Sequence, residues 1–395
     1  MKSIIFIPGI EATALVNANT FDFGTVWNAY DNLPSAIGTK LTGLYMEEAL
    51  QLDPQYDSNI SQMVERNHIA RLPYEAALKG LSTKLGAQLY LFGYDWRLSN
   101  IENGRRLKSY FYSLRTKINN LLPAGETNQF YFLTHSMGGL VLLNFVNELQ
   151  TADLKDIAKI ILIAPPLQGS PYALIHMVQE ESGFKGLVNA MLNRRIDVRK
   201  VMRTFPSIYE LLPTYPGAIT YMDDSTDVDL MNTSNWQSNL IKDNDSGASQ
   251  ALFENRLNML AQYRSRKIKF PDLLGNKTLI IAGAGDETIT NIKVERLYRN
   301  TRNFLKLDEA SLIQGSGDGT VPIISSTAWH NRILTLAVNK QQVKNPLVSA
   351  SFHGLMLRES SIQNIIKRFF ENDTLYTPAS DISDLQSLGD RVEKV

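Results

Sequence analysis

Cysteine is absent from the 395-residue chain. This absence excludes a disulfide framework, a thiolate nucleophile and any metal site built on sulfur. A catalytic nucleophile in this chain must therefore be an oxygen or a nitrogen atom. The length predicts two or three compact units, or one core that carries a large insertion.

The chain also lacks an excess of charge of either sign, because 40 Lys and Arg residues balance 40 Asp and Glu residues. A general nucleic-acid binder needs a basic surface, so we expect no nucleic-acid partner. Hydrophobic residues make up 44% of the chain and charged residues 20%, which is typical of globular proteins rather than disordered ones. We expect neither a cofactor nor a metal ion.

Long hydrophobic runs are missing as well. No stretch of about 18 apolar residues occurs, so we expect no transmembrane segment. The apolar run at residues 3–7 is too short for a signal peptide and ends at Pro8. It predicts a buried strand, and the expected location is the cytoplasm, or outside the cell if a leader has been removed.

Short runs rich in β-branched and aromatic residues recur between turn residues, as expected for strands buried on both faces. They cover residues 3–7, 87–92, 130–134, 159–163 and 277–282. Segments with helical periodicity lie between several of them, for instance at 104–122 and 137–149. This alternation predicts an α/β fold with a mostly parallel, doubly wound sheet.

The pattern changes after Pro165 to amphipathic helices and polar loops without a convincing strand, as far as about Leu274. Such a segment is too long for an ordinary connection. We therefore predict a helical cap or lid over residues 165–274, inserted between core parts at 1–164 and 275–372. Residues 373–395 are polar and are expected to form a loosely packed C-terminal tail.

Residues 130–143 have the pattern of a nucleophile elbow: an apolar strand, a tight turn with Ser136, and a periodic helix. In such a turn the serine has a strained backbone, and its hydroxyl projects at the head of the helix. The N–H of Met137 then points to where an oxyanion would form. Thr134 replaces the first glycine of the usual G-x-S-x-G pattern, but the flanking strand, glycine pair and helix support the interpretation.

A serine hydroxyl is a weak nucleophile at neutral pH and needs a base, which in this type of fold follows the acid in the order Ser, Asp or Glu, His. Of the five histidines, only His330 and His353 lie late enough in the chain. We favour His353, because it lies beside Gly354 where a strand gives way to a loop. His330 follows a tryptophan near an apolar run and is typical of a packed or half-exposed side chain.

Two aspartates are candidates for the acid, which must accept the Nδ1–H of the base and fix its tautomer. Asp318 lies in the glycine-dense loop 315–319, and Asp286 lies in the loop 283–288 directly after a predicted strand. We favour Asp318 for its loop. Asp286 stays open as the alternative, or as a turn residue or part of the floor of the substrate pocket.

The second oxyanion donor is expected in the loop after the first strand, residues 8–13. Gly9 allows the backbone to turn close to the substrate. This leaves the N–H of Ile10 as the best candidate and that of Glu11 as the next. Glu11 is also expected to affect the polarity of the substrate-binding pocket.

Several blocks of the chain occur in an order that resembles lecithin:cholesterol acyltransferase-like proteins, a family that includes lysosomal phospholipase A2. The most discriminating block is Tyr94-Asp95-Trp96-Arg97-Leu98-Ser99, because ordinary α/β-hydrolases lack it. The other matching blocks are residues 6–10, 134–139, 164–171, 317–322 and His353.

The resemblance implies an α/β-hydrolase fold with a cap and a lid, acting on ester bonds of lipids. The site residues that it implies are Ser136 as nucleophile, Asp318 as acid, His353 as base, and Ile10 and Met137 as oxyanion donors. Trp27 is similar to a tryptophan near the acyl site of the family. The lack of cysteines and of a secretion signal departs from mammalian members and indicates a microbial relative.

The expected activity is that of a serine lipase, phospholipase or O-acyltransferase working through an acyl-enzyme on Ser136. A short-chain carboxylesterase or thioesterase with the same triad is one alternative, and a catalytically silent binding protein on this fold is another. The expected partner is a lipid or another ester. A basic amphipathic stretch at residues 187–203 would let the cap contact an anionic membrane or lipid surface.

Overall fold

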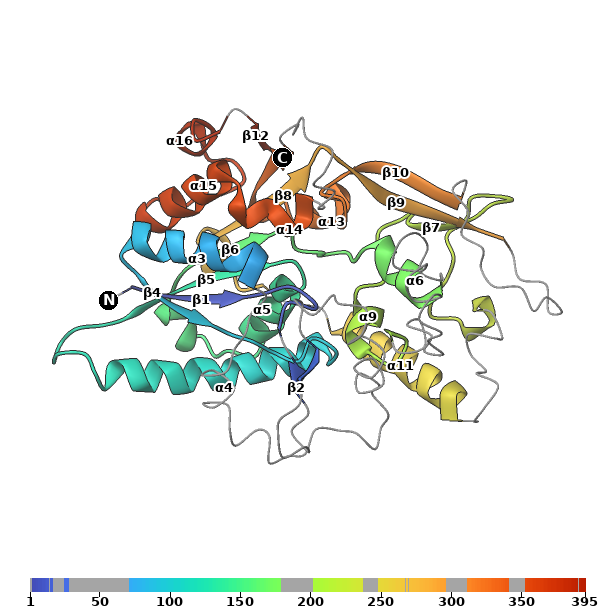
Figure 1. The fold of residues 1–395 in the computed structure, drawn as a ribbon, viewed down its shortest axis with the longest axis horizontal. Helices are drawn as coiled ribbons and strands as arrows, with labels where there is room; N and C mark the ends of the chain where they lie inside the picture. Colours follow the sequence, from blue (N-terminus) through green and yellow to red (C-terminus); the bar gives the residue numbers. More distant parts are fainter. Residues whose placement is uncertain are drawn as a thin grey trace.

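The computed structural model describes residues 2–13, 15–16, 25–27, 71–178, 202–236, 248–266, 268, 270–295, 311–340, 352–389 and 391–395. At its centre lies a seven-stranded sheet in the order β12-β11-β8-β6-β5-β1-β4 (Figure 1). Every neighbouring pair is parallel except β11 and β12. The strands are β1 (Lys2–Ile7), β4 (Gln88–Leu91), β5 (Gln129–His135), β6 (Ile157–Ile163), β8 (Thr278–Ala284), β11 (Leu334–Asn339) and β12 (Val392–Lys394).

Helices cover both faces of this sheet, as Figure 1 shows. One face carries α3 (Arg71–Leu85) and α15 (Ser360–Glu371), and the other carries α4 (Asn100–Asn119) and α5 (Gly138–Asn147). The chain thus has the predicted α/β architecture, with a mostly parallel sheet between two helical layers.

The side chains of β1 show how one strand serves both layers. Ile4 and Phe6 pack in the cluster under α3 and α15, whereas Ile5 and Ile7 pack in the cluster under α4 and α5. Successive side chains of a strand point to opposite faces, so a strand covered on both sides must be apolar throughout. This is why continuous apolar runs, rather than alternating ones, identified the central strands.

A second sheet of three strands, in the order β10-β9-β7, lies beside the first (Figure 1). It consists of β7 (Ile219–Tyr221), β9 (Asp286–Val294) and β10 (Leu312–Gly317). The expectation that residues 165–274 contain no strand is wrong at β7. This strand has three residues and pairs with residues 292–294, far later in the chain, so no local pattern could reveal it.

Short elements complete the described part of the chain. Within the predicted cap lie α6 (Pro171–Val178), α9 (Pro206–Glu210), the 3-10 turn η4 (Thr233–Asn235), α11 (Ala248–Ser265) and α12 (Asp272–Gly275). Elsewhere lie β2 (Leu15–Val16), β3 (Thr25–Trp27), η3 (Asp153–Asp156), α13 (Ile323–Ser326), α14 (Phe352–Leu355), η6 (Met356–Arg358) and α16 (Ser383–Gln386). The domain boundaries at 164/165, 274/275 and 372/373 stay predictions.

The C-terminal residues are packed into the fold, contrary to the expectation of a loose tail. β12 adds an antiparallel edge strand in which Val392 lies opposite Val338. Tyr376 and Leu385 are buried in the cluster under α15. These apolar residues are widely spaced and follow neither a helical nor a strand period, so the sequence pattern did not reveal them. No helix in the described ranges is long and apolar enough to cross a membrane.

Candidate active site

Ser136 lies at the turn between β5 and α5. Its φ angle is 54°, in the left-handed region that few residues other than glycine adopt. The Ser136 N–H donates to the carbonyl oxygen of Ile163 on the neighbouring strand (2.8 Å). Helix α5 begins at Gly138, so the serine lies at the positive end of the helix dipole. This is the strained strand–turn–helix geometry that the sequence predicted.

Two glycines let the end of β1 approach this turn. A Cβ atom at Gly138 would lie only 2.4 Å from the carbonyl oxygen of Ile7 and 2.5 Å from that of Pro8. A Cβ atom at Gly9 would lie 3.0 Å from the Cβ of Ser136. The loop after β1 therefore lies directly against Ser136, where the second oxyanion donor was expected.

Met137 directly follows Ser136 in the chain, and Ile10 follows Gly9, whose Cβ position lies against Ser136. Among the described residues, neither of their main-chain N–H groups donates a hydrogen bond. Glu11 turns the chain immediately afterwards with a φ angle of 62° and is half-buried. Unpartnered amides beside a nucleophile are what an oxyanion site requires.

His353 and Asp318 are joined side chain to side chain. Nδ1 of His353 lies 2.7 Å from Oδ2 of Asp318, and the His353 N–H donates to the Asp318 carbonyl oxygen (2.8 Å). The other carboxylate oxygen accepts the N–H groups of Thr320 (3.0 Å) and Val321 (2.7 Å). Asp318 is completely buried, whereas the His353 side chain is 11% exposed. The carboxylate is thus held in one orientation, toward an imidazole that reaches solvent.

Asp286, the alternative acid, lies beside Asp318, since the two residues form a parallel bridge. Its carboxylate already has partners: Oδ1 accepts from Nζ of Lys340 (2.9 Å) and Oδ2 from the N–H of Phe352 (3.1 Å). Asp286 therefore holds the main chain next to His353, while Asp318 contacts the imidazole itself.

His135, directly before Ser136, belongs to the site although the sequence analysis did not select it. Its Nε2 lies 2.8 Å from the carbonyl oxygen of His353, and its Nδ1 lies 2.8 Å from the hydroxyl of Tyr74. The two imidazole rings are 4.7 Å apart. Burial lowers the pKa of His135 to about 3, so the ring is neutral, with Nε2–H donating and Nδ1 accepting. Its position beside the serine was the available signal.

The Tyr94–Arg97 block also acts on the site, whereas the sequence analysis had used it only as a mark of the family. The Tyr94 hydroxyl donates to the carbonyl oxygen of Pro8 (2.9 Å), and Nε1 of Trp96 donates to that of Thr13 (3.0 Å). Both side chains are buried. They bind both ends of the loop that carries Ile10, and so they fix its position relative to Ser136.

The remaining sequence candidates lie elsewhere. His330 is exposed on a turn, with its Nδ1 2.9 Å from the carbonyl oxygen of Thr327. Trp27 pairs with Leu15 between β3 and β2, but its side chain lies outside the described part of the structure. The basic stretch 187–203 also lies outside it, except for residues 202 and 203.

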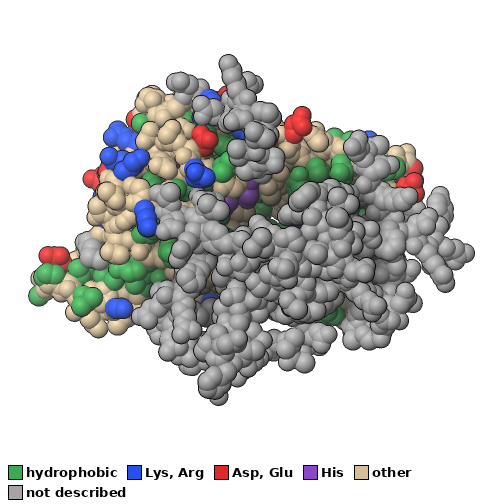
Figure 2. Space-filling view, in the orientation of Figure 1, with side chains coloured by type: hydrophobic (Ala, Val, Ile, Leu, Met, Phe, Trp, Pro, Cys, Tyr) green, Lys and Arg blue, Asp and Glu red, His purple; other side chains and the backbone are tan. Residues whose placement is uncertain are grey.

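Two further observations concern the surface of the molecule and the side chains that could bind a metal ion. Figure 2 shows histidine atoms reaching the surface near the middle of the face that it presents. Within the described residues, no group of three or more His, Cys, Asp and Glu side chains could hold a metal ion.

Comparison with known proteins adds a family to this geometry. Residues 84–278 match the family model of lecithin:cholesterol acyltransferase. This segment, just under half of the chain, is thus similar to lecithin:cholesterol acyltransferase. Phospholipase A(1) LCAT3 from Arabidopsis thaliana is 27% identical to it over 183 residues, which is 46% of this chain and 39% of that protein. Lecithin-cholesterol acyltransferase-like 4 from the same plant is 28% identical over 128 residues, 32% and 23% of the two chains.

The segment that matches the family model contains Ser136 and the Tyr94–Arg97 block but ends before Asp318 and His353. The chain spans less than half the length of either plant relative. A chain in the crystal structure of the Tle4–Tli4 complex has a similar structure. The match covers 93% of this chain and 97% of that chain, with a TM-score of 0.58 and 14% sequence identity. Such a likeness shows the fold, and the chain has the α/β-hydrolase fold.

Proposed function

We propose that this chain is a serine hydrolase that cleaves carboxylic esters of lipids, as a lipase or phospholipase, through a triad of Ser136, Asp318 and His353. The observation that carries the proposal is the 2.7 Å contact between His353 Nδ1 and the buried Asp318 carboxylate. The His353 ring lies 4.7 Å from that of His135, the residue directly before the left-handed Ser136. The name phospholipase A(1) of one plant relative supports a phospholipid ester as substrate.

In the first step, Nε2 of His353 accepts the hydroxyl proton of Ser136 while Oγ attacks the ester carbonyl carbon. Asp318 accepts the Nδ1–H and stabilises the imidazolium. Negative charge on the carbonyl oxygen is stabilised by the N–H groups of Ile10 and Met137, and one such donor contributes on the order of 3 kcal/mol. The bond to the leaving alcohol then breaks, His353 protonates that alcohol, and the acyl-enzyme remains.

In the second step, a water molecule or an acceptor alcohol transfers its proton to His353 and attacks the acyl carbon. The Ser136 ester bond breaks, and the serine oxygen recovers the proton from His353. Water produces a fatty acid, and an alcohol produces a new ester. Hydrolysis and O-acyl transfer therefore use the same residues and differ only in the second nucleophile.

The nucleophile is tested with Ser136→Ala, which should abolish hydrolysis of a p-nitrophenyl acyl ester without changing the melting temperature. A fluorophosphonate should label the unaltered chain at Ser136. Ser109→Ala is a matched control, because Ser109 is exposed on α4 and its hydroxyl donates a long hydrogen bond to the Arg105 carbonyl oxygen of the same helix (3.4 Å). A Ser136→Ala protein with the rate of the unaltered chain would refute the assignment.

Paired variants test the base and the acid against their sequence rivals. His353→Gln should abolish turnover, and His330→Gln should leave it unchanged. Asp318→Asn should lower kcat by roughly 10⁴-fold, because the imidazole loses its correct tautomer. Asp286→Asn should lower the melting temperature, since it releases Phe352 and Lys340, and it should lower kcat much less than Asp318→Asn does. The reverse order for the two aspartates would assign the acid to Asp286.

Substrate profiling separates this proposal from its alternatives. A lipase or phospholipase should show its highest kcat/KM on long-chain or phospholipid esters, whereas a short-chain carboxylesterase or thioesterase should prefer butyryl esters or thioesters. A silent binding protein would not react with the fluorophosphonate. Contact between the cap and an anionic lipid surface is part of the proposal, and anionic vesicles should then be hydrolysed faster than neutral ones. The cytoplasmic location stays a prediction.

A further inference from the structure

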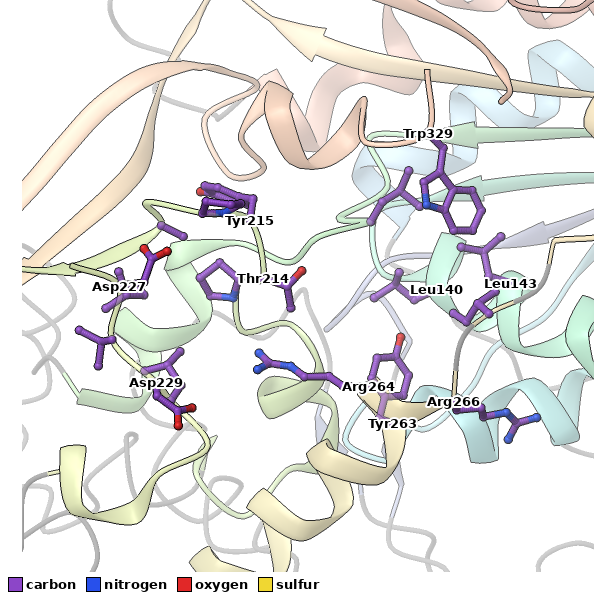
Figure 3. Close-up of a pocket in the computed structure, with 18 of the residues that line it drawn as sticks. Leu140, Leu143, Thr214, Tyr215, Asp227, Asp229, Tyr263, Arg264, Arg266 and Trp329 are labelled. Atoms are coloured by element: carbon purple, nitrogen blue, oxygen red, sulfur yellow. The ribbon is translucent and has the colours of Figure 1, made fainter. Parts of the chain in front are cut away.

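A cavity of about 640 Å³ lies between α5 and the segments that flank β7. It is bounded by Leu140 and Leu143 on α5, by residues 213–219 and 227–230, by the end of α11, and by Trp329 (Figure 3). The residues that line it do not include the proposed triad, Ser136, Asp318 and His353, or the proposed oxyanion donors. Its volume is within the range of small-molecule sites, roughly 300–1,000 Å³.

Leu140, Leu143 and Trp329 form an apolar wall on one side of the cavity (Figure 3). Further apolar side chains of the lining are Leu167, Ile219, Val228 and Leu230. A wall of this kind binds an aliphatic chain through the removal of apolar surface from water. It provides no polar group to orient that chain, so the direction of a ligand must be set by the polar side of the cavity.

Arg264 is the cationic group on that side. Its guanidinium points into the space between Thr214 and Asp229 (Figure 3). It makes one long hydrogen bond to the Leu212 carbonyl oxygen (3.4 Å), and its buried Nε has no hydrogen-bond partner. Burial lowers its pKa, an effect that the charge of Asp229 opposes. A desolvated guanidinium without an ion pair among the described residues is costly, and a ligand anion would relieve that cost.

The two other arginines of the lining are already engaged. Arg266 forms an ion pair with Glu148, and its side chain points away from the space around Arg264 (Figure 3). Arg332 is exposed and lies over the Trp329 ring, 5.7 Å from its centre. Arg264 is thus the guanidinium in this cavity with donors to spare.

Two carboxylates limit the charge that the cavity accepts. Asp227 and Asp229 line the side that Arg264 faces. Their Oδ1 atoms are held by the N–H groups of Gly217 (2.7 Å) and Met231 (2.9 Å). Because these two carboxylates are held in place, they repel a second negative charge on a ligand. A group with one negative charge is therefore favoured over a dianion such as a phosphate monoester.

We propose that this cavity binds a monoanionic amphiphile, a fatty carboxylate, with its head group on Arg264 and its alkyl chain along the apolar wall. The site is separate from the catalytic residues and does not depend on their assignment. If the chain hydrolyses lipid esters, a fatty carboxylate is one of its products, and this cavity would hold the product away from Ser136.

Decanoate, decanol and decyl phosphate are the probes, titrated by calorimetry into the full chain and two variants. Decanoate should bind saturably and more tightly than decyl phosphate. Arg264→Gln should weaken decanoate by at least about tenfold, the effect of one charge-assisted hydrogen bond, and leave decanol within about twofold. Arg332→Gln, the matched control in the same lining, should change decanoate by less than threefold.

A second variant guards against a folding defect in the first. Val228→Phe fills the chain-binding side and should weaken decanoate and decanol equally, with the melting temperature as the check on folding. Three outcomes overturn the proposal: no saturable binding of decanoate, decanoate affinity unchanged in both Arg264→Gln and Val228→Phe, or tighter binding of decyl phosphate. Binding that resists both variants would place the carboxylate elsewhere on the chain.

Discussion

Nε2 of His135 lies 2.8 Å from the main-chain carbonyl oxygen of His353, so the residue before the proposed nucleophile holds the backbone of the proposed base. The Tyr74 hydroxyl fixes the other side of the His135 ring. Because the pKa of His135 is lowered to about 3, the ring is neutral at higher pH, and this contact does not change with pH there. It is a positioning contact between the elbow and the loop of the base.

His135→Ala should therefore lower kcat far more than it raises KM. The His353 segment loses an anchor, and a displacement of about 1 Å costs on the order of 100-fold in rate. Ester kinetics measure the change, with His330→Ala as the exposed control. The midpoint of the acidic limb of the kcat profile should stay where it is, because His135 does not titrate there; a shifted limb would contradict the positioning role.

Tyr94→Phe tests whether the family-specific block positions the loop that carries Ile10. The variant removes the donor to the Pro8 carbonyl oxygen, so we expect kcat to fall about tenfold with little change in KM. Tyr110→Phe is the matched control, because this buried hydroxyl bonds weakly to Leu91 (3.4 Å), away from the loop. Equal losses of kcat in the two variants would indicate a general packing defect instead.

Gly138 and Gly80 should respond to alanine in opposite directions. At Gly138 the new Cβ would meet main-chain oxygens at 2.4 and 2.5 Å, which cannot move independently, so we expect a loss of about 3 kcal/mol or more. At Gly80, inside α3, nothing lies within 4 Å, and alanine should stabilise the chain by roughly 0.5–1 kcal/mol. Urea unfolding measures both. Similar losses at the two positions would contradict the close approach of β1 to the elbow.

Glu210 makes the stability of the chain depend on pH. Its carboxylate accepts hydrogen bonds from Ser99 and from the main-chain and side-chain nitrogens of Asn100 (2.7 and 2.8 Å) at the start of α4. Burial nevertheless raises its pKa from 4.5 to about 7. The folded chain therefore keeps a proton that the unfolded chain has already lost.

From this group, stability is greatest below pH 4.5 and falls as the pH rises toward 7, by up to about 3 kcal/mol. Glu210→Gln removes this titration. The unfolding free energy of the variant, relative to that of the unaltered chain, should therefore increase from pH 5 to pH 8. Glu102→Gln, which changes a partly exposed carboxylate on the surface of α4, serves as control. A difference that stays constant with pH would contradict a raised pKa.

Much of the fold and part of the site could be read from local sequence. The runs at 130–134 and 159–163 lie within β5 and β6, and the helical segment 137–149 contains α5. The elbow at Ser136 was visible for the same reason, because a strand, a tight turn and a helix are consecutive in the chain. His353 and Asp318 were selected from order and loop composition, and the structure brings them together.

Only the tertiary structure decided contacts between residues far apart in the chain. β7 exists because it pairs with β9, and the tail is ordered because β12 completes the sheet edge. Asp318 was distinguished from Asp286 as the candidate acid because its carboxylate contacts the His353 imidazole, whereas that of Asp286 contacts the Phe352 main chain.

The sequence by itself determined the α/β architecture and the absence of a sulfur nucleophile, because apolar periodicity and composition are local properties. The proposed roles of His135, Tyr94 and Arg264 required the fold. Those of His135 and Tyr94 depend on main-chain oxygens that long-range packing brings into place. That of Arg264 depends on a guanidinium that has no ion pair among the described residues.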